Sequence, residues 1–174
     1  MMNNCSLGFR KISIEDFYFL KSILQNRDLM LLGWGKIYSD NEVEDWIYKI
    51  NQQYETYGYS YFIVDDLKKE KAIGIAGIIK TNINSIATDE IAYIVKKDFQ
   101  GRGYGIKITQ KLVNLAFNNY NLSQIVAQIV PENVASQKLI HELGMTYQFS
   151  YNRNQNGILK NHLVYLLKNE SKNT

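Results

Sequence analysis

The chain has 174 residues and a formal net charge of +3, and 45% of its residues are hydrophobic against 21% that are charged. This balance is typical of a soluble globular protein, and the length predicts one domain spanning residues 1–174 with a sizeable core. The longest apolar run, residues 73–79, is too short to span a bilayer, and the first residues lack the basic and apolar segments of a signal peptide. We therefore expect no membrane partner.

Cysteine content and the distribution of basic residues exclude two further classes. Cys5 is the only cysteine, so an internal disulfide is impossible and the cytoplasm is the default location. The lysines are scattered along the chain, which is typical of a solvated surface and not of a nucleic-acid footprint. His141 and His162 lack the spacing of metal ligands, so we expect no metal.

Helix starts and stops divide the chain into four predicted helices. Ser13-x-x-Asp16 is close to a capping box, and Ser39-x-x-Glu42 is a complete one. Gly144 stands where a glycine ends a helix. The segment at 29–38 is irregular and predicts no regular element. The four helices begin at residue 13, cover 39–58, run from the end of a glycine-rich loop to about residue 120, and cover 133–143.

Between the helices, runs rich in β-branched and aromatic residues predict strands. Three of them form an antiparallel meander, with a loop at 82–88 between the second and the third. A helix separates the third from the next strand, so those two should lie parallel. A hairpin follows, and the tail from Lys168 should be loose. The predicted strands cover residues 7–12, 59–64, 72–80, 90–95, 124–130, 145–153 and 159–167.

A glycine-rich segment at 100–105 lies between a predicted strand and a predicted helix. Glycines allow the backbone to approach a ligand closely, and the first N–H groups of a helix bind anions. The third glycine of a dinucleotide fingerprint would fall on Ile106, and Lys107 is not followed by the serine or threonine of a P-loop. Those two phosphate-binding motifs are excluded, while turn glycines without a ligand stay an alternative.

Two motifs and the order of elements resemble the Gcn5-related N-acetyltransferase (GNAT) family. Gln100-x-x-Gly103-x-Gly105 is similar to the pyrophosphate loop of that family, and Asn133-x-x-Ser136 before Leu143-Gly144-Met145 is similar to its Asn-x-x-Ala/Ser…Gly-Phe segment. The pattern looks most like the ribosomal-protein alanine acetyltransferase branch. The resemblance implies an α+β fold with a mixed, mostly antiparallel sheet of about seven strands, flanked by four helices. In it, one parallel strand pair splays apart at the cofactor cleft.

The same resemblance implies acetyl-CoA as co-substrate and assigns residues to bind it. The central strand would pair with the pantetheine arm, and the glycine loop would hold the pyrophosphate, with Arg102 either contributing charge or standing as an exposed loop cation. The backbone N–H of Val95 would face the thioester carbonyl as the oxyanion donor. The implied acetyl-CoA-binding residues are Tyr93, Ile94, Val95, Gln100, Gly101, Arg102, Gly103, Tyr104, Gly105, Asn133 and Ser136.

Acetyl transfer to an amine requires the neutral amine, and a lysine amine has a pKa of about 10.4. Glu90, at the start of the central strand, is the candidate base, acting directly or through water; its alternative is a sheet-edge glutamate facing solvent. The family often has an acidic tyrosine where this chain has Ile140, and Ser136 occupies the position of an acid proposed in the alanine branch. Asn133 and Ser136 are alternatively helix-start residues that satisfy backbone N–H groups.

Trp34 and Tyr38 are candidate substrate-binding residues of an acceptor pocket, whereas Trp46 fits the core by its helical spacing. The resemblance predicts a cytoplasmic N-acetyltransferase, monomeric or homodimeric, that transfers the acetyl group of acetyl-CoA to a primary amine. The amine is a protein N-terminal α-amine or a small molecule, and it attacks directly through a tetrahedral intermediate. Alternatives are an amino-sugar, polyamine or antibiotic N-acetyltransferase of the same fold, and a CoA-binding module without catalysis.

Overall fold

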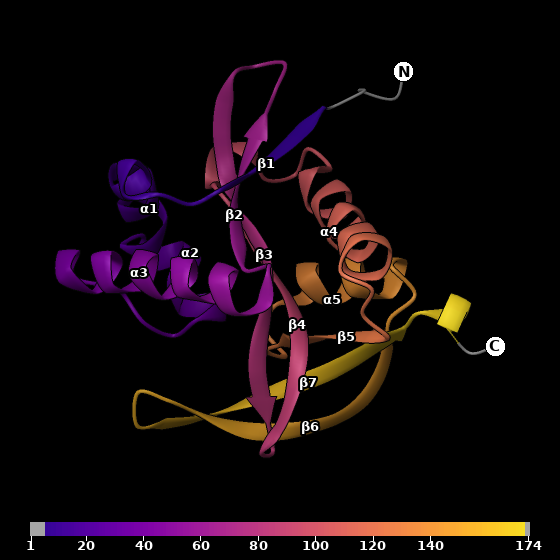
Figure 1. The fold of residues 1–174 in the computed structure, drawn as a ribbon. Coiled ribbons are helices and arrows are strands. Elements are labelled where there is room, and N and C mark those ends of the chain that lie inside the picture. Colours follow the sequence, from indigo (N-terminus) through magenta and orange to yellow (C-terminus); the bar gives the residue numbers. More distant parts are fainter. Residues whose placement is uncertain (1–5, 173–174) are drawn as a thin grey trace.

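The computed structural model describes residues 6–172, so Cys5 lies outside the described residues. The described chain forms one mixed sheet in the order β1-β2-β3-β4-β5-β7-β6, with β4 and β5 as its parallel pair (Figure 1). This confirms the predicted α+β fold and its seven strands. The strands are β1 Leu7–Lys11, β2 Tyr61–Asp66, β3 Lys71–Ile83, β4 Ile86–Val95, β5 Gln124–Ile129, β6 Thr146–Gln155 and β7 Ile158–Lys168.

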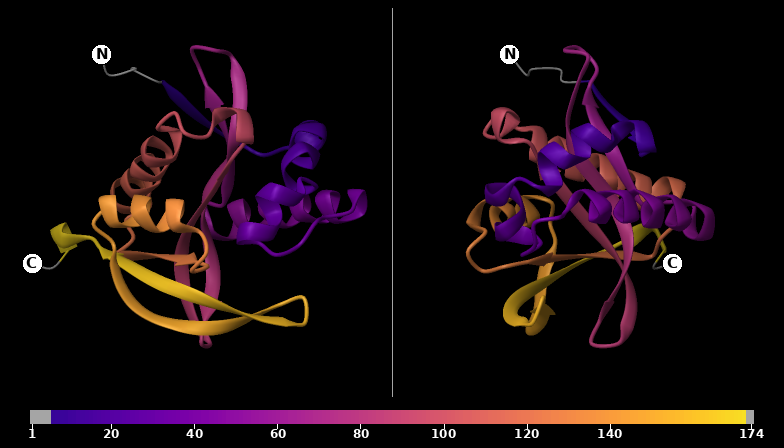
Figure 2. Two further views of the ribbon diagram at one scale, coloured as in Figure 1. Left: turned by 180° about the vertical axis from the view of Figure 1, so that it is seen from behind. Right: turned by 90° about the vertical axis from the view of Figure 1, so that its left-hand side faces the viewer.

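Five α-helices lie on the sheet in the described part of the chain, where the sequence predicts four. Helices α1 to α3 cover one face and α4 and α5 cover the other, as the two views of Figure 2 show. None of the described helices combines the length and the apolar character needed to cross a bilayer. The helices are α1 Phe17–Leu24, α2 Arg27–Gly33, α3 Asp40–Tyr57, α4 Tyr104–Asn114 and α5 Val134–Glu142.

Helix α2 is the one that the sequence pattern does not predict. It begins where the side chain of Asn26 accepts a hydrogen bond of 3.1 Å from the backbone N–H of Leu29, and it buries Met30 completely. Seven residues span only two turns, which is too few for a helical period to stand out from irregular structure. The helix positions the segment at 33–38, which follows it directly, beside the sheet.

The meander between β2 and β4 is tighter than the sequence predicts. Instead of a loop at 82–88, β3 and β4 stay paired up to Ile83 and Ile86, and the chain reverses over Asn84 and Ser85. Both turn residues have positive φ, 50° and 68°, as the twist of a two-residue hairpin requires. The prediction is wrong here because an Asn-Ser pair gives a weaker hairpin signal than Asn-Gly.

The parallel strands β4 and β5 touch at one point and then separate. Their ladder holds a single residue pair, Glu90 with Val126, whereas β5 pairs with β7 over six residues. In Figure 1, β4 runs steeply up the molecule from the turn at the bottom, while β5 crosses it at a wide angle. The second half of β4 therefore has β3 along one edge and a gap along the other, as the splayed pair implied by the resemblance requires.

Alternation along β4 decides which side chains reach which face of the sheet. Ile91 and Val95 belong to the core beneath α4 and α5, which we call the α4–α5 face. Ile94 belongs to the core beneath α1 to α3, the α1–α3 face. By the same alternation Tyr93 lies on the α4–α5 face and Glu90 on the α1–α3 face. The two residues of greatest chemical interest thus lie on opposite sides of one strand.

The C-terminal segment is anchored rather than loose through residue 172. Asn169 is buried; its backbone N–H donates to the carbonyl of Ser123 at 2.8 Å, and its side-chain amide donates to the carbonyl of Leu122 at 3.3 Å. A short 3-10 helix, Glu170–Lys172, follows. The polar composition of this segment indicates exposure, and only the fold shows that one asparagine ties it to the start of β5.

Candidate active site

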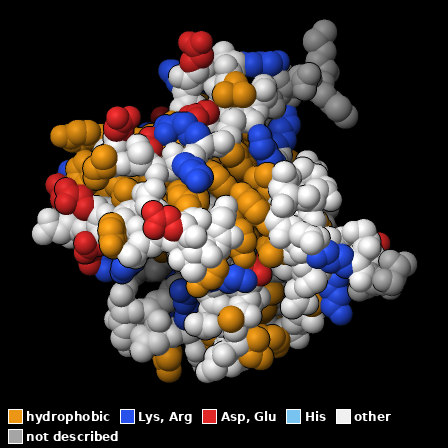
Figure 3. Space-filling model, viewed as in Figure 1, with side chains coloured by type: hydrophobic (Ala, Val, Ile, Leu, Met, Phe, Trp, Pro, Cys, Tyr) orange, Lys and Arg blue, Asp and Glu red, His pale blue; other side chains and the backbone are white. Residues whose placement is uncertain are grey.

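A cavity of about 450 Å³ opens where β4 and β5 separate. Its lining comes from both faces of the sheet: Glu90 and Trp34 on the α1–α3 face, Tyr93 and Ser136 on the α4–α5 face. The cavity therefore passes through the sheet at the gap. The β6–β7 hairpin curls beneath the N-terminal helices and completes the wall, and Figure 3 shows the surface hollowed between them.

Glu90 stands at the point where the strands part, and it is 7% exposed. The alternative prediction, that Glu90 faces solvent at the sheet edge, is thus wrong, because the side chain is buried. Burial raises the pKa of Glu90 to about 7, against hydrogen bonds from Gln128 and Thr81 and the charge of Arg153, which lower it. A carboxyl group with that pKa exchanges a proton near neutral pH, the property that a general base needs.

Two further side chains hold Glu90 in place. The amide Nε2 of Gln128, on β5, donates to Oε2 of Glu90 at 2.8 Å. The hydroxyl of Tyr151, on β6, donates in turn to the amide oxygen of Gln128. Sequence reasoning does not identify Gln128 or Tyr151, because nothing in the local pattern relates three residues on three different strands. They link Glu90 to β5 and, through Gln128, to β6.

Tyr93 and Ser136 meet on the other side of the gap. The hydroxyl of Tyr93 lies 3.2 Å from Oγ of Ser136, at the first turn of α5, and burial raises the pKa of Tyr93. Asn133 caps that helix, accepting from the backbone N–H of Ser136 at 3.1 Å, as the helix-start alternative predicts. Ile140, where the family often has a tyrosine, is buried and lines the same cavity.

The glycine loop leads into α4 with open space at two of its glycines. Gly101 and Gly103 have positive φ, 70° and 75°, and a Cβ on either would meet nothing within 4 Å. Gly103 is the N-cap of the eleven-residue helix α4 and supplies no side-chain cap. The first-turn N–H groups consequently lack a capping side chain, the arrangement that favours anion binding. The amide of Gln100 donates to the carbonyl of Val95 at 2.9 Å and ties the loop to β4.

The remaining loop residues have distinct surroundings. Arg102 is exposed, and with Lys69 and Lys71 it lines a second, open hollow beside the loop. Tyr104 is buried, and its hydroxyl donates to Asp66 at 2.5 Å, so its side chain serves the core while its backbone belongs to the loop. Gly105 allows close packing, because a Cβ there would lie 2.9 Å from Cδ1 of Leu139.

An aromatic cluster forms the wall of the cavity on the α1–α3 face. The ring of Trp34 packs against those of Tyr38, Trp46 and Tyr61, with centroids 5.5–6.3 Å apart. All four rings line the cavity. Trp46 is 9% exposed, so it belongs to the core, as its spacing predicts, and also to the wall. Tyr61 is a lining residue that the strand pattern alone does not single out.

The hairpin contributes a second polar group. His162 is buried; its Nδ1 lies 2.9 Å from the carbonyl oxygen of Lys160, and burial lowers its pKa, so the ring is neutral at pH 7. Nε2 of Gln155 lies 3.3 Å from Nε2 of His162 and donates to the carbonyl of Gly33 at 3.2 Å. These contacts fasten the hairpin to the end of α2. Within residues 6–172, no group of three metal-ligating side chains is present.

The parted strands, the uncapped helix start and the buried carboxyl group together fit a transferase that takes an acyl group from a phosphorylated carrier. The family model described as "Acetyltransferase (GNAT) domain" matches residues 6–146, and the chain belongs to this family. The GNAT family membership makes the protein an acetyl-CoA-dependent N-acetyltransferase.

Solved structures share the fold, and one uncharacterized relative matches most of the chain. The spermidine N-acetyltransferase of Vibrio cholerae, in complex with CoA and spermine, has a TM-score of 0.78 at 21% identity, covering 93% of this chain and 95% of that one. The ribosomal-protein-S5-alanine acetyltransferase of Vibrio fischeri has a TM-score of 0.77 at 20% identity, covering 97% and 96%. YkkB of Bacillus subtilis is 23% identical over 141 residues, 81% of this chain and 82% of that protein. The alanine branch is therefore one of several that share this fold.

Proposed function

We propose that the protein acetylates a primary amine that enters the cavity on the α1–α3 face, while the acyl arm of acetyl-CoA lies in the gap between β4 and β5. One observation carries the proposal: Glu90 is buried at the point where the two strands part, on the face opposite the α4 helix start. The two substrates thus reach the same gap from opposite sides, and the base faces the amine.

Binding of acetyl-CoA rests on backbone groups of the loop and of β4. The first-turn N–H groups of α4 hold the pyrophosphate, with Gln100, Gly101, Gly103 and Gly105 shaping the loop. The edge of β4 at Tyr93, Ile94 and Val95 pairs with the pantetheine amides as an added strand would. Asn133 and Ser136 contact the arm from the first turn of α5, and Arg102 adds a cation beside the phosphates.

Polarisation of the thioester falls to the backbone N–H of Val95. The next N–H along, that of Lys96, donates to the carbonyl of Ile73 on β3 at 2.9 Å. Because successive N–H groups of a strand point to opposite edges, the N–H of Val95 points into the gap. A donor fixed there stabilises the negative charge that develops on the carbonyl oxygen when the amine attacks.

Glu90 removes the proton of the attacking amine, directly or through a water molecule. The amine nitrogen forms a bond to the carbonyl carbon, the tetrahedral intermediate collapses, and the carbon–sulfur bond breaks. The amine proton passes to Glu90, and the thiolate takes a proton as it leaves. A pKa of about 7 suits Glu90 to this role near neutral pH.

The departing sulfur leaves on the α4–α5 face, where Ile140 cannot supply a proton. Ser136 is our candidate donor, with the hydroxyl of Tyr93 behind it at 3.2 Å. A thiol with a pKa of about 8.5 is a tolerable leaving group near neutral pH, so we assign this pair a modest share of the rate.

A screen of free-thiol release tests the proposal. Acetyl-CoA is incubated with the protein and a panel of peptides with free N-termini, amino acids, polyamines and amino sugars. We expect thiol release to depend on one class of amine, and calorimetry to show acetyl-CoA binding at tens of micromolar or tighter. Binding of acetyl-CoA without release by any amine would overturn the proposed transfer to a primary amine.

A further inference from the structure

The acceptor side of the cavity carries an excess of positive charge. Three cations line the cavity, Lys36, Lys49 and Arg153, and Glu90 is the only acidic residue among the described lining residues. Lys36 is neutralised by Glu42, at 2.5 Å. Lys49 and Arg153 form no ion pair with any of the residues at 6–172. Two cations therefore line the cavity without an ion pair to any residue at 6–172.

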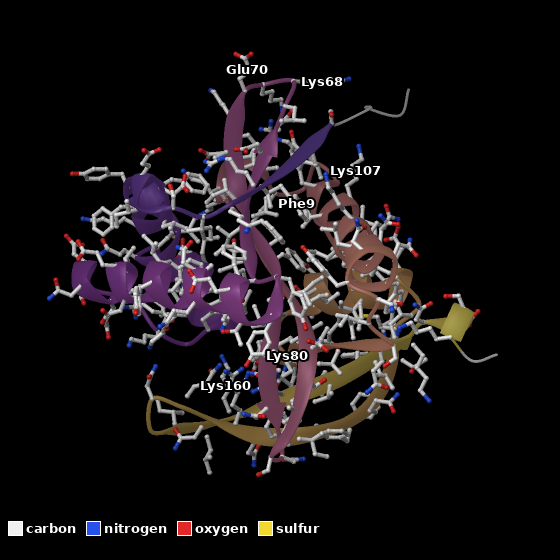
Figure 4. All side chains as sticks on the ribbon, viewed as in Figure 1. Phe9, Lys68, Glu70, Lys80, Lys107 and Lys160 are labelled. Atoms are coloured by element: carbon white, nitrogen blue, oxygen red, sulfur yellow. The ribbon has the colours of Figure 1, made fainter. Side chains whose placement is uncertain are left out.

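Arg153 is held at the cavity by its neighbours on β6. Alternate residues of a strand share a face, which places Arg153 on the same face as Tyr151 and Gln155. Tyr151 reaches the cavity wall through Gln128, and Gln155 reaches it through Gly33. Arg153 stands between these two anchored neighbours as an exposed residue that lines the cavity. Figure 4 shows its cross-strand partner Lys160 on the same hairpin below the N-terminal helices.

The field of Arg153 extends over the reaction site. Its positive charge lowers the pKa of Glu90, of Tyr38 and of His162. Glu132 acts in the opposite sense on His162, yet it does not line the cavity. An acceptor seated beside Glu90 is thus within electrostatic reach of Arg153, and a second positive charge on that acceptor would be repelled.

We propose that the acceptor is a small primary amine that also carries a carboxylate, as an amino acid does, with its amine at Glu90 and its carboxylate on Arg153 and Lys49. The planar fork of a guanidinium matches a carboxylate with two hydrogen bonds. Lys49 adds charge from α3, across the cavity from the hairpin. The inference rests on the proposed function, because it assumes that the acceptor amine meets Glu90. It excludes a polyamine, whose several ammonium groups would meet two unpaired cations.

Matched pairs of amines separate the carboxylate from the rest of the acceptor. The panel contains L-amino acids, the corresponding amino acid amides and the corresponding decarboxylated amines, with spermidine as the polycation. Thiol release measures kcat and KM. Both tryptophans of the chain, Trp34 and Trp46, line the cavity, so quenching of intrinsic fluorescence measures acceptor binding without turnover. We expect the free amino acids to exceed their amides and decarboxylated amines at least tenfold in kcat/KM.

Arg153→Gln tests the residue. We expect KM for the preferred amino acid and its fluorescence Kd to rise about tenfold or more, because the variant loses hydrogen bonds to a charged group. We expect kcat at saturation to change less than threefold. Lys168→Gln, at the far end of β7, removes the same charge away from the cavity and should leave both constants unchanged. Arg153→Glu should bring spermidine into the range of accepted amines.

Three outcomes overturn the inference. Equal or better use of amides or decarboxylated amines would mean that the carboxylate is not recognised, while leaving the proposed acetyl transfer intact. Preference for spermidine by the unaltered protein would do the same. If no amine releases thiol although acetyl-CoA binds, the proposed function fails and the inference fails with it.

Discussion

The two faces of β4 differ in the groups that they offer to a substrate: backbone groups on one face and side chains on the other. On the α4–α5 face, the groups that we propose to bind acetyl-CoA are mostly backbone N–H groups from one short segment, the loop at 100–105 and the first turn of α4. On the α1–α3 face, the cavity is built from side chains of many separated segments: the end of α2, α3, the strands β2 to β5, and the β6–β7 hairpin. A backbone site tolerates most changes of side chain, whereas a side-chain site is defined by each one. We therefore expect the first region to carry the features common to the family, and the second to carry the side chains that select the acceptor.

The largest expected effect is at the side-chain site, where one atom can be changed without altering shape. Glu90→Gln keeps the size and the burial of the side chain but removes the base. We expect turnover to fall about 100-fold or more, the range of general base catalysis, with calorimetric affinity for acetyl-CoA kept within twofold. In the unaltered protein the rate should rise with pH through about 7; an identical pH profile in the variant would remove Glu90 from the mechanism.

Burial of Glu90 also makes stability depend on pH. Its pKa is about 7 in the folded protein against 4.5 for an exposed glutamate, so between these values the folded state holds a proton that the unfolded state releases. The free energy of unfolding should consequently fall as pH rises from about 4.5 to 7, by on the order of 2–3 kcal/mol. Urea midpoints at pH 5 and pH 8 measure this fall. Glu90→Gln should show a smaller one, and parallel falls in both proteins would contradict the burial.

At the backbone site, only a substitution that obstructs the main chain should matter. Gly103→Val puts a branched side chain into the open space before α4, at a φ of 75° that valine resists. We expect the calorimetric Kd for acetyl-CoA to rise at least about tenfold, the equivalent of a few lost N–H contacts. Gly58→Val is the matched control, because Gly58 has a φ of 81°, equally open space and a place at the end of α3, away from the loop. Similar losses in both variants would mean that strain, and not the phosphate site, is responsible.

The smallest expected effect is at Tyr151, which contacts Glu90 only through Gln128. Tyr151→Phe deletes the hydroxyl that orients Gln128 and leaves the ring in place. Loss of one hydrogen bond of about 1 kcal/mol should lower kcat about fivefold and displace the pH–rate profile, because Gln128 then holds Glu90 less firmly. Tyr147→Phe, on the same strand but exposed, should change neither quantity. A loss of stability in Tyr151→Phe without a change in its pH profile would reduce Tyr151 to a packing residue.

Local patterns predict most of the scaffold. The box of Ser39 and Glu42 begins α3, with both reciprocal hydrogen bonds formed, and Gly58 ends it. Gly101 and Gly103 precede α4, and the parallel pairing of β4 with β5 follows from the helix between them. These predictions succeed because capping, turn formation and crossover handedness depend on residues a few positions apart. Prediction from local patterns fails for α2 and for the Asn84-Ser85 turn, because there burial and strand pairing override a weak local signal.

The acceptor side resists prediction for a different reason. Glu90, Trp34 and Tyr38 are each singled out by the sequence, and all line the cavity. Their partners Gln128, Tyr151 and Arg153 are ordinary polar residues of strands, with nothing to distinguish them from a solvated face. Only the curl of the β6–β7 hairpin, fastened by Gln155 to Gly33 across 122 positions, turns that face inward.

The sequence by itself determined the order of the strands, the helices other than α2, the position of the glycine loop and the family, because those features depend on neighbours along the chain. The tertiary structure alone decided that Glu90 is buried and hydrogen-bonded to Gln128, that Tyr93 meets Ser136, and that Lys49 and Arg153 line the same cavity. Burial and electrostatic environment are sums over residues that folding brings together, and a linear pattern does not contain them.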